Sequence, residues 1–202
     1  MKRFSGIIVV LLFLCVDICA QNREVMVWGI PFASSKKDLI AAIQANAPDA
    51  IIVDVRQQGN SLLWRANGFP DEYLRFDGFN VYSAAAEFTS DDKLARAYIG
   101  LIPTNGKKVF KLYSTVKKYL TAKYGNPESD YAFFKSPYHQ KGNENNTWAV
   151  IEGKCVYSAF WTVPYRKSTI TISIEITNER QVELSFVDEK AKVSSSVLQT
   201  AN

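Results

Sequence analysis

The stretch "TITISIEITNERQVELSF", residues 169–186, decides the fold class. Isoleucine occupies every second position from Ile170 to Ile176, and threonine, serine or glutamate fills the positions between them. The same alternation returns in "QVELSF" after the polar connection "TNER". Strict alternation is typical of an antiparallel strand that has one face on a core and the other in water. The stretch therefore predicts a β-hairpin.

Other segments also have the composition of strands and are bounded by turn residues such as Asp77-Gly78. These segments are residues 50–56, 61–66, 79–88, 93–102, 147–152 and 155–163. Most of the chain is thus expected to form short antiparallel strands.

Two segments have a helical period instead. In "SSKKDLIAAIQAN", residues 34–46, Ser35 can cap a helix together with Asp38 three positions later. The second segment, "GKKVFKLYSTVKKYLTAKYGNP", residues 106–127, has the strongest periodic signal, and Gly125 marks its end. Its apolar residues recur at helical spacing: Val109, Leu112, Tyr113, Val116, Tyr119 and Leu120. Of these, Val109, Leu112, Val116 and Leu120 should face the sheet.

The order of these elements predicts an α+β fold, with an antiparallel sheet and helices packed on one of its faces. Each predicted helix is followed by a run of strands, so residues 28–102 and 103–190 are possible tandem repeats of one helix and four strands. We expect residues 21–202 to form a single globular region that ends in a polar tail, residues 191–202.

The first 20 residues have the pattern of a cleaved secretory signal. Lys2 and Arg3 precede a short apolar run, which has too few residues to cross a bilayer comfortably. Ala20 supplies the small residue before a cleavage site, whereas Cys15 and Cys19 lack the small residues that precede a lipid-modified cysteine. We expect an exported protein, periplasmic or secreted, that begins at Gln21 and has no lipid or other stable membrane anchor.

Composition narrows the possible functions. Residues 1–20 carry two basic residues and one acidic residue, so the mature chain keeps a net charge of +3 of the +4 of the whole sequence. This charge is too small to indicate a nucleic-acid partner. Cys155 is the only cysteine beyond the signal, so an intramolecular disulfide cannot form. The expected role of Cys155 is that of a small buried apolar residue, and a reactive thiol is the alternative.

Two further stretches carry a family resemblance. They are "WGIPFASSKKDL", Trp28 to Leu39, and "KYLTAKYGNP", Lys118 to Pro127. Together with the order of helix and strands, they resemble the β-lactamase-inhibitor-protein architecture, and the small outer-membrane assembly lipoprotein BamE is similar. The resemblance implies a function in binding other proteins, and it assigns a role to no single residue.

The residues that usually carry catalysis are scarce. His139 is the only histidine, so a zinc site with several histidines is excluded, and no nucleophile motif surrounds it. Acidic pairs such as Asp71/Glu72 and Asp91/Asp92 flank expected turns, where solvated side chains are common. No glycine-rich phosphate loop of standard spacing occurs. We therefore expect neither enzyme activity nor a cofactor or bound metal.

The first candidate binding group is basic. Lys107, Lys111 and Lys118 fall on one face of the second predicted helix, and no acidic residue lies between Lys107 and Tyr124. Such a face can contact an acidic partner or an anionic membrane surface. The simpler interpretation is a solvated helix face that keeps the protein in solution.

The second candidate group is aromatic. Tyr131, Phe133, Phe134 and Tyr138 lie within eight residues of "YAFFKSPYHQ", directly after the second helix. Tyrosine and phenylalanine are enriched in the cores of protein interfaces. The alternative is an edge strand that packs its aromatic side chains into the core.

These features predict a non-enzymatic binding module of the bacterial envelope or exterior that presents a sheet face or a loop to an unknown protein partner. The alternative is a carrier of a small ligand or lipid, with an apolar pocket between sheet and helices lined by Trp148, Tyr157 or Trp161. A hydrolase with an unrecognised site is the third possibility, and it would need an acidic residue beside His139.

Overall fold

The computed structural model describes residues 24–55, 60–66, 74–103, 108–139 and 143–191. The helices are α2 (Lys36–Asn46), α3 (Val109–Tyr124) and α4 (Asn143–Ile151). The strands are β1 (Met26–Val27), β2 (Ile30–Pro31), β3 (Ile51–Val55), β4 (Ser61–Arg65), β5 (Leu74–Phe76), β6 (Phe79–Phe88), β7 (Leu94–Leu101), β8 (Ser129–Phe134), β9 (Cys155–Tyr165), β10 (Ser168–Ile176) and β11 (Val182–Asp188).

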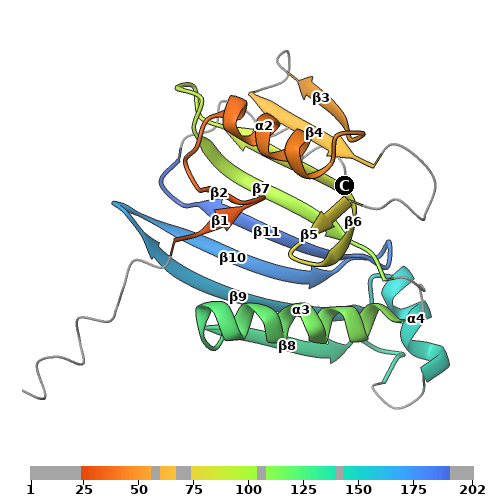
Figure 1. Ribbon diagram of the computed structural model, residues 1–202. Helices are drawn as coiled ribbons and strands as arrows, with labels where there is room; N and C mark the ends of the chain where they lie inside the picture. The colour runs from red at the N-terminus through yellow and green to blue at the C-terminus, as the bar shows by residue number, and fades with distance from the viewer. Residues whose placement is uncertain (1–23, 56–59, 67–73, 104–107, 140–142, 192–202) are drawn as a thin grey trace, which may run out of the picture.

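Nine of the strands form one antiparallel sheet in the order β3-β4-β6-β7-β11-β10-β9-β8, with β5 paired to β6 (Figure 1). Helix α2 precedes β3, β4, β6 and β7, and helix α3 precedes β8 to β11. These two groups of strands lie side by side and meet where β7 pairs with β11. The predicted α+β class with an antiparallel sheet is confirmed.

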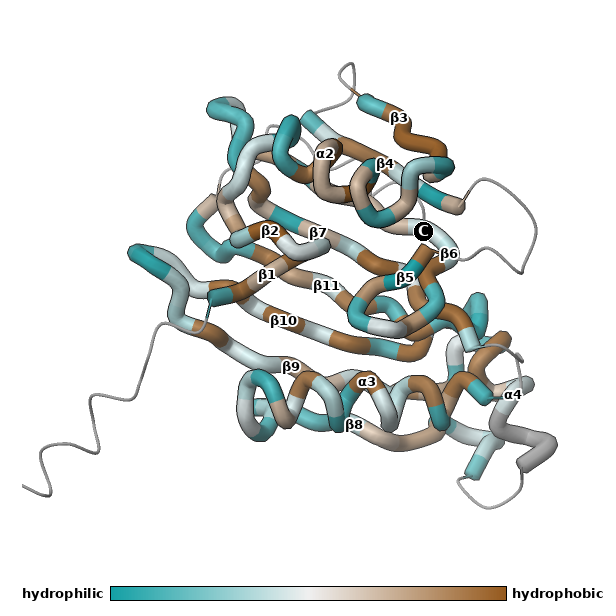
Figure 2. Tube along the Cα trace, in the orientation of Figure 1, coloured by the Kyte–Doolittle hydropathy of each residue, from teal (hydrophilic) through white to brown (hydrophobic). Residues whose placement is uncertain are grey.

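The predicted hairpin is present and forms the middle of the sheet. In it, Ile172 lies opposite Phe186 and Ile174 lies opposite Leu184. All four isoleucines of β10 are buried, as alternation predicts. Hydrophobic and hydrophilic residues alternate along β10 and β11 in Figure 2.

One face of the sheet carries the core. A row of buried residues crosses six neighbouring strands on this face and contains Trp161, Ile172, Phe186, Ala97, Ala86 and Leu62. Helices α2 and α3 and the β1–β2 pair all lie on this side (Figure 1), which we call the covered face. The opposite side is called the uncovered face below.

The predicted signals at the helix ends are present. Ser35 and Asp38 form a capping box at the start of α2. Helix α3 ends at Tyr124, and Gly125 follows it with a φ of 93°, a conformation that glycine adopts without strain. Val109, Val116 and Leu120 of its apolar stripe are buried.

The prediction of a strand at residues 147–152 is wrong, because most of this segment belongs to α4. A short apolar run such as "TWAVI" does not distinguish a buried strand from a buried helix turn. The overlooked signal is Gly153, which has a φ of 65° and follows the helix in a Schellman motif. In this motif Gly153 N–H donates to Val150 O, and Lys154 N–H donates to Ala149 O.

Candidate functional site

The uncovered face exposes a group of aromatic side chains near one edge of the sheet. Tyr131 and Phe133 point to this face from β8, and Phe160 points to it from β9. Their exposed fractions are 47%, 46% and 37%. The rings of Tyr131 and Phe160 meet edge to face with centroids 6.4 Å apart. We call these three residues the aromatic patch.

The structure separates the four aromatic residues that the sequence grouped together. Phe134 points to the covered face and packs against Phe110 of α3 and Tyr157 of β9, with ring centroids 6.0 and 5.8 Å away. Tyr138 lies after β8, and a hydrogen bond to the Glu152 carboxylate raises its pKa. Strand β8 is an edge strand, as the alternative interpretation expected, but it does not pack its aromatic residues into the core: Tyr131 and Phe133 are exposed, and Phe134 is half-buried on the covered face.

The basic group lies on the other side of the molecule. Lys111 and Lys118 are exposed on α3, which packs on the covered face, and Lys107 lies outside the described residues. Two other lysines of α3 form ion pairs: Lys117 with Asp130, and Lys123 with Asp77 at 3.8 Å. The basic and aromatic groups therefore lie on opposite faces of the sheet.

A second feature of the uncovered face is a hollow of about 420 Å³ over β3, β4, β6, β7 and β11. Small residues, among them Ala85 and Gly100, lie at this hollow, and a side chain at Gly100 would meet Gln181 Oε1 at 2.8 Å. Its lining contains Ile51, Val53, Leu63, Trp64, Arg65, Ser83, Ala84, Ala85, Tyr98, Gly100, Glu179, Gln181 and Glu183.

Two of the groups in the hollow have altered acidity. Burial raises the pKa of Glu183, and the carboxylates of Glu175 and Glu179 raise it further. Glu175 lies directly opposite Glu183 across β10 and β11. Two like charges in directly opposite positions destabilise a strand pair. Burial also raises the pKa of Tyr98, with a further contribution from Glu87. The hollow therefore combines apolar walls with a carboxyl group that releases its proton less readily than usual.

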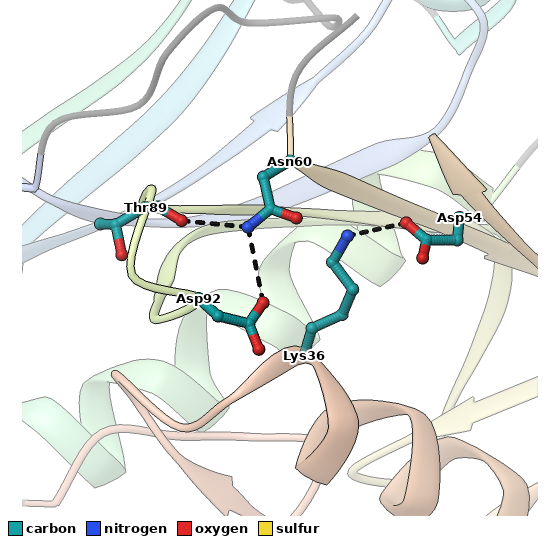
Figure 3. A network of polar contacts seen from close by, with 5 residues as sticks. All are labelled: Lys36, Asp54, Asn60, Thr89 and Asp92. Atoms are coloured by element: carbon teal, nitrogen blue, oxygen red, sulfur yellow. Dashed lines mark hydrogen bonds and ion pairs between the residues drawn. The ribbon is translucent and has the colours of Figure 1, made fainter. Parts of the chain in front are cut away.

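A polar network fixes α2 to the opposite edge of the sheet (Figure 3). Lys36 Nζ donates to Asp54 Oδ1 of β3 at 2.7 Å and lies 5.5 Å from the centre of the Phe88 ring. Close by, the Asn60 amide donates to Thr89 O at 3.0 Å and to Asp92 Oδ1 at 3.4 Å. Lys36 is only 7% exposed and is paired with Asp54. The network is therefore best explained as a structural contact that holds α2, the edge strand β3 and the β6–β7 hairpin together.

Two residues of types that often carry catalysis are His139 and Cys155. His139 is exposed, and no group of three or more potential metal ligands occurs among the described residues. Burial raises the pKa of the Cys155 thiol to about 11, so this half-buried cysteine remains protonated at neutral pH.

The residues named for an apolar carrier pocket do not line the hollow. Trp161 is buried and donates its Nε1–H to Gly125 O at 2.9 Å, while Trp148 is 61% exposed. Tyr157 packs in an aromatic cluster with Phe110, Tyr113 and Phe134. The hollow lies elsewhere, on the uncovered face. No helix within the described ranges has the length and apolar character that a membrane span needs.

Comparisons of the chain with protein-family models, curated proteins and solved structures give no match. The resemblance to the β-lactamase-inhibitor-protein architecture therefore stays a prediction. Function has to be argued from the uncovered face itself.

Sequence reasoning missed Phe160 and the hollow. Phe160 had a usable signal, because the alternation in "SAFWTVPY" places it on the face opposite Trp161. The hollow had none, since its lining comes from five strands whose neighbours are set by the sheet order.

Proposed function

We propose that this chain is an exported, non-enzymatic binding module that contacts a protein partner through the aromatic patch. The observation that carries the proposal is the position of Tyr131, Phe133 and Phe160, which are substantially exposed together on the face that the helices leave open. Aromatic residues are enriched at interface cores and supply much of the binding energy there.

These side chains lie in water because they point away from the face that carries α2, α3 and the β1–β2 pair. The residues on either side of Phe160 in β9, Ala159 and Trp161, point to the covered face and are buried. Burial of apolar surface contributes roughly 25 cal/mol of free energy for every square ångström removed from water, and each exposed aromatic side chain lacks this contribution. A partner that covers the patch would recover this free energy on binding.

The place of action follows from the expected signal at residues 1–20, which supports export to the bacterial envelope or exterior. The architecture-level resemblance to proteins that bind other proteins supports the same class of function.

The experiment is affinity capture from the envelope extract of the source cells with two variants of the tagged protein. In the first, Tyr131, Phe133 and Phe160 are replaced by serine; in the second, Lys111 and Lys118 on the covered side are replaced by glutamine. Circular dichroism and thermal unfolding check that both variants fold. We expect a partner that the wild type and the lysine variant capture and the serine variant loses. A partner retained by a folded serine variant would refute the proposal.

Small-ligand binding in the hollow is the second candidate function. It is favoured by the volume of about 420 Å³ and by the combination of apolar walls with Tyr98 and Glu183. Native mass spectrometry of the purified protein would detect a co-purified ligand. The candidate requires a bound mass that is absent after denaturation and is reduced in Glu183→Gln.

A further inference from the structure

The hollow on the uncovered face has a polar end where β7 meets β11. Glu183 of β11 lies opposite Gly100 of β7. Glu179 and Gln181 come from the turn between β10 and β11, and both also line the hollow. Because Gly100 has no side chain, Gln181 Oε1 occupies the space over it, 2.8 Å from where a Cβ would lie. This end therefore gathers two carboxylates and an amide oxygen, all of which accept hydrogen bonds.

The negative charge at this end is not balanced by a neighbouring cation. Glu183 is half-buried, and Glu175 lies directly opposite it on β10. No lysine or arginine of the described part of the chain forms an ion pair with Glu175, Glu179 or Glu183. Arg65 also lines the hollow, but it is exposed and lies three strands from Glu183, about 14 Å at the usual strand spacing. A positive group would thus be stabilised beside Glu183.

The rest of the hollow has apolar walls. Val53, Leu63, Ala85 and Tyr98 lie opposite one another in turn on β3, β4, β6 and β7. Ala85 is small, so it leaves room between Leu63 and Tyr98, and Val53 is 49% exposed. An apolar group placed here would gain roughly 25 cal/mol for every square ångström removed from water. The volume of about 420 Å³ lies in the range of small-molecule sites.

We propose that the hollow binds a small organic cation, in which an apolar body such as a phenyl ring or a short hydrocarbon chain carries an ammonium group. The ammonium group donates hydrogen bonds to Glu183 and Gln181 Oε1, and the body lies between Leu63 and Tyr98. Its charge also offsets the repulsion between the opposed carboxylates of Glu175 and Glu183. The inference rests on the second candidate function, small-ligand binding in the hollow, and it does not depend on the aromatic patch.

Four matched compounds test this ligand class in titrations of the purified protein, followed by two-dimensional amide NMR spectra at neutral pH. Phenethylammonium has both the charge and the ring. Phenethyl alcohol has the ring without the charge, hydrocinnamate reverses the charge, and ethylammonium lacks the ring. We expect phenethylammonium to bind and each of the other three to bind at least tenfold more weakly. No binding of phenethylammonium up to about 10 mM, or equal binding of phenethyl alcohol, would overturn the inference.

Three variants, checked for folding by circular dichroism and thermal unfolding, separate charge from shape. Glu183→Gln removes the carboxylate at nearly constant size, so it should bind phenethylammonium at least tenfold more weakly and no better than phenethyl alcohol. Ser83 lies opposite Gly100, and Ser83→Leu fills the hollow and should weaken both compounds. Glu189→Gln is the matched control, because Glu189 is exposed after β11 and does not line the hollow; it should bind as wild type does. A folded Glu183→Gln protein that still prefers phenethylammonium to the alcohol would contradict the inference.

The outcome is distinguishable from failure of the second candidate function. If native mass spectrometry detects a co-purified ligand without a basic nitrogen, and Ser83→Leu loses it, small-ligand binding stands and the ligand class is refuted. The amide spectra also locate phenethylammonium: we expect shifts at Ala85, Tyr98 and Gly100, and shifts confined to β8 and β9 would refute the site. A captured protein partner that phenethylammonium displaces would assign the hollow to a basic side chain of that partner and would also overturn the inference.

Discussion

Replacing Ile172 by alanine tests the packing of the sheet at its centre. Ile172 is fully buried on β10, between Trp161 of β9 and Phe186 of β11. The substitution removes three carbon groups, which at about 0.8 kcal/mol each amounts to about 2.4 kcal/mol of lost transfer free energy. A residual cavity of roughly 40 Å³ adds about 1 kcal/mol, since cavities cost about 24 cal/mol per Å³. We therefore expect the free energy of unfolding to fall by about 3 kcal/mol.

Urea denaturation followed by tryptophan fluorescence and circular dichroism measures this change. With an m-value of about 2 kcal/mol per molar urea, the midpoint of Ile172→Ala should fall by about 1.5 M. Ile151→Ala is the matched control, because the same atoms are removed from a side chain that is 41% exposed. That control should change the free energy by under about 1 kcal/mol. Equal midpoints for wild type and Ile172→Ala would refute the burial of this face.

Three further predictions concern charge and processing. Because burial raises the pKa of Glu183 above the usual glutamate value of 4.5, the stability that its protonated form contributes is present below that value and is lost as pH rises through the folded-state pKa. Glu183→Gln should thus be more stable than wild type at pH 7 and equal to it near pH 3, and a difference that does not change with pH would contradict this. Replacing Lys107, Lys111 and Lys118 by glutamine should change the free energy of unfolding by less than about 0.5 kcal/mol and leave vesicle co-sedimentation unchanged at low and high salt; salt-sensitive binding lost in this variant would make α3 a functional surface. The intact mass of the exported protein should correspond to a chain that begins at Gln21, and a diacylglyceryl-modified cysteine at its amino terminus would disprove the expected cleavage.

Local patterns predicted the parts of the fold that depend on neighbours in sequence. The alternation from Ile170 to Phe186 determined both strands of the hairpin, and the period of α3 with its Gly125 stop determined that helix. The prediction of a strand at residues 147–152 failed because this apolar run is too short for its period to distinguish a strand from a helix. The decisive residue there is Gly153, whose role depends on two backbone hydrogen bonds of the helix end.

The candidate site could be predicted only in part. The aromatic cluster in "YAFFKSPYHQ" was visible, but the register of β8 against β9 decides that Tyr131 and Phe133 face outward while Phe134 faces the core. A shift of one residue would have exchanged the two sets. Lys111 and Lys118 of α3 were expected in solvent, and both are exposed. That they lie on the opposite face from the aromatic patch could not be predicted, because it depends on the sheet topology.

The central claim, that the uncovered face at the aromatic patch meets a protein, is tested most directly by photo-crosslinking in the source cells. A benzoylphenylalanine placed at Phe160 reports on the patch, and the same group at Lys118 reports on the covered side. A third position, Trp148, is 61% exposed and lies on α4 as a control for exposure alone. We predict a discrete crosslinked protein from position 160 and none from 118 or 148. Crosslinking from position 118 with none from position 160 would contradict the account.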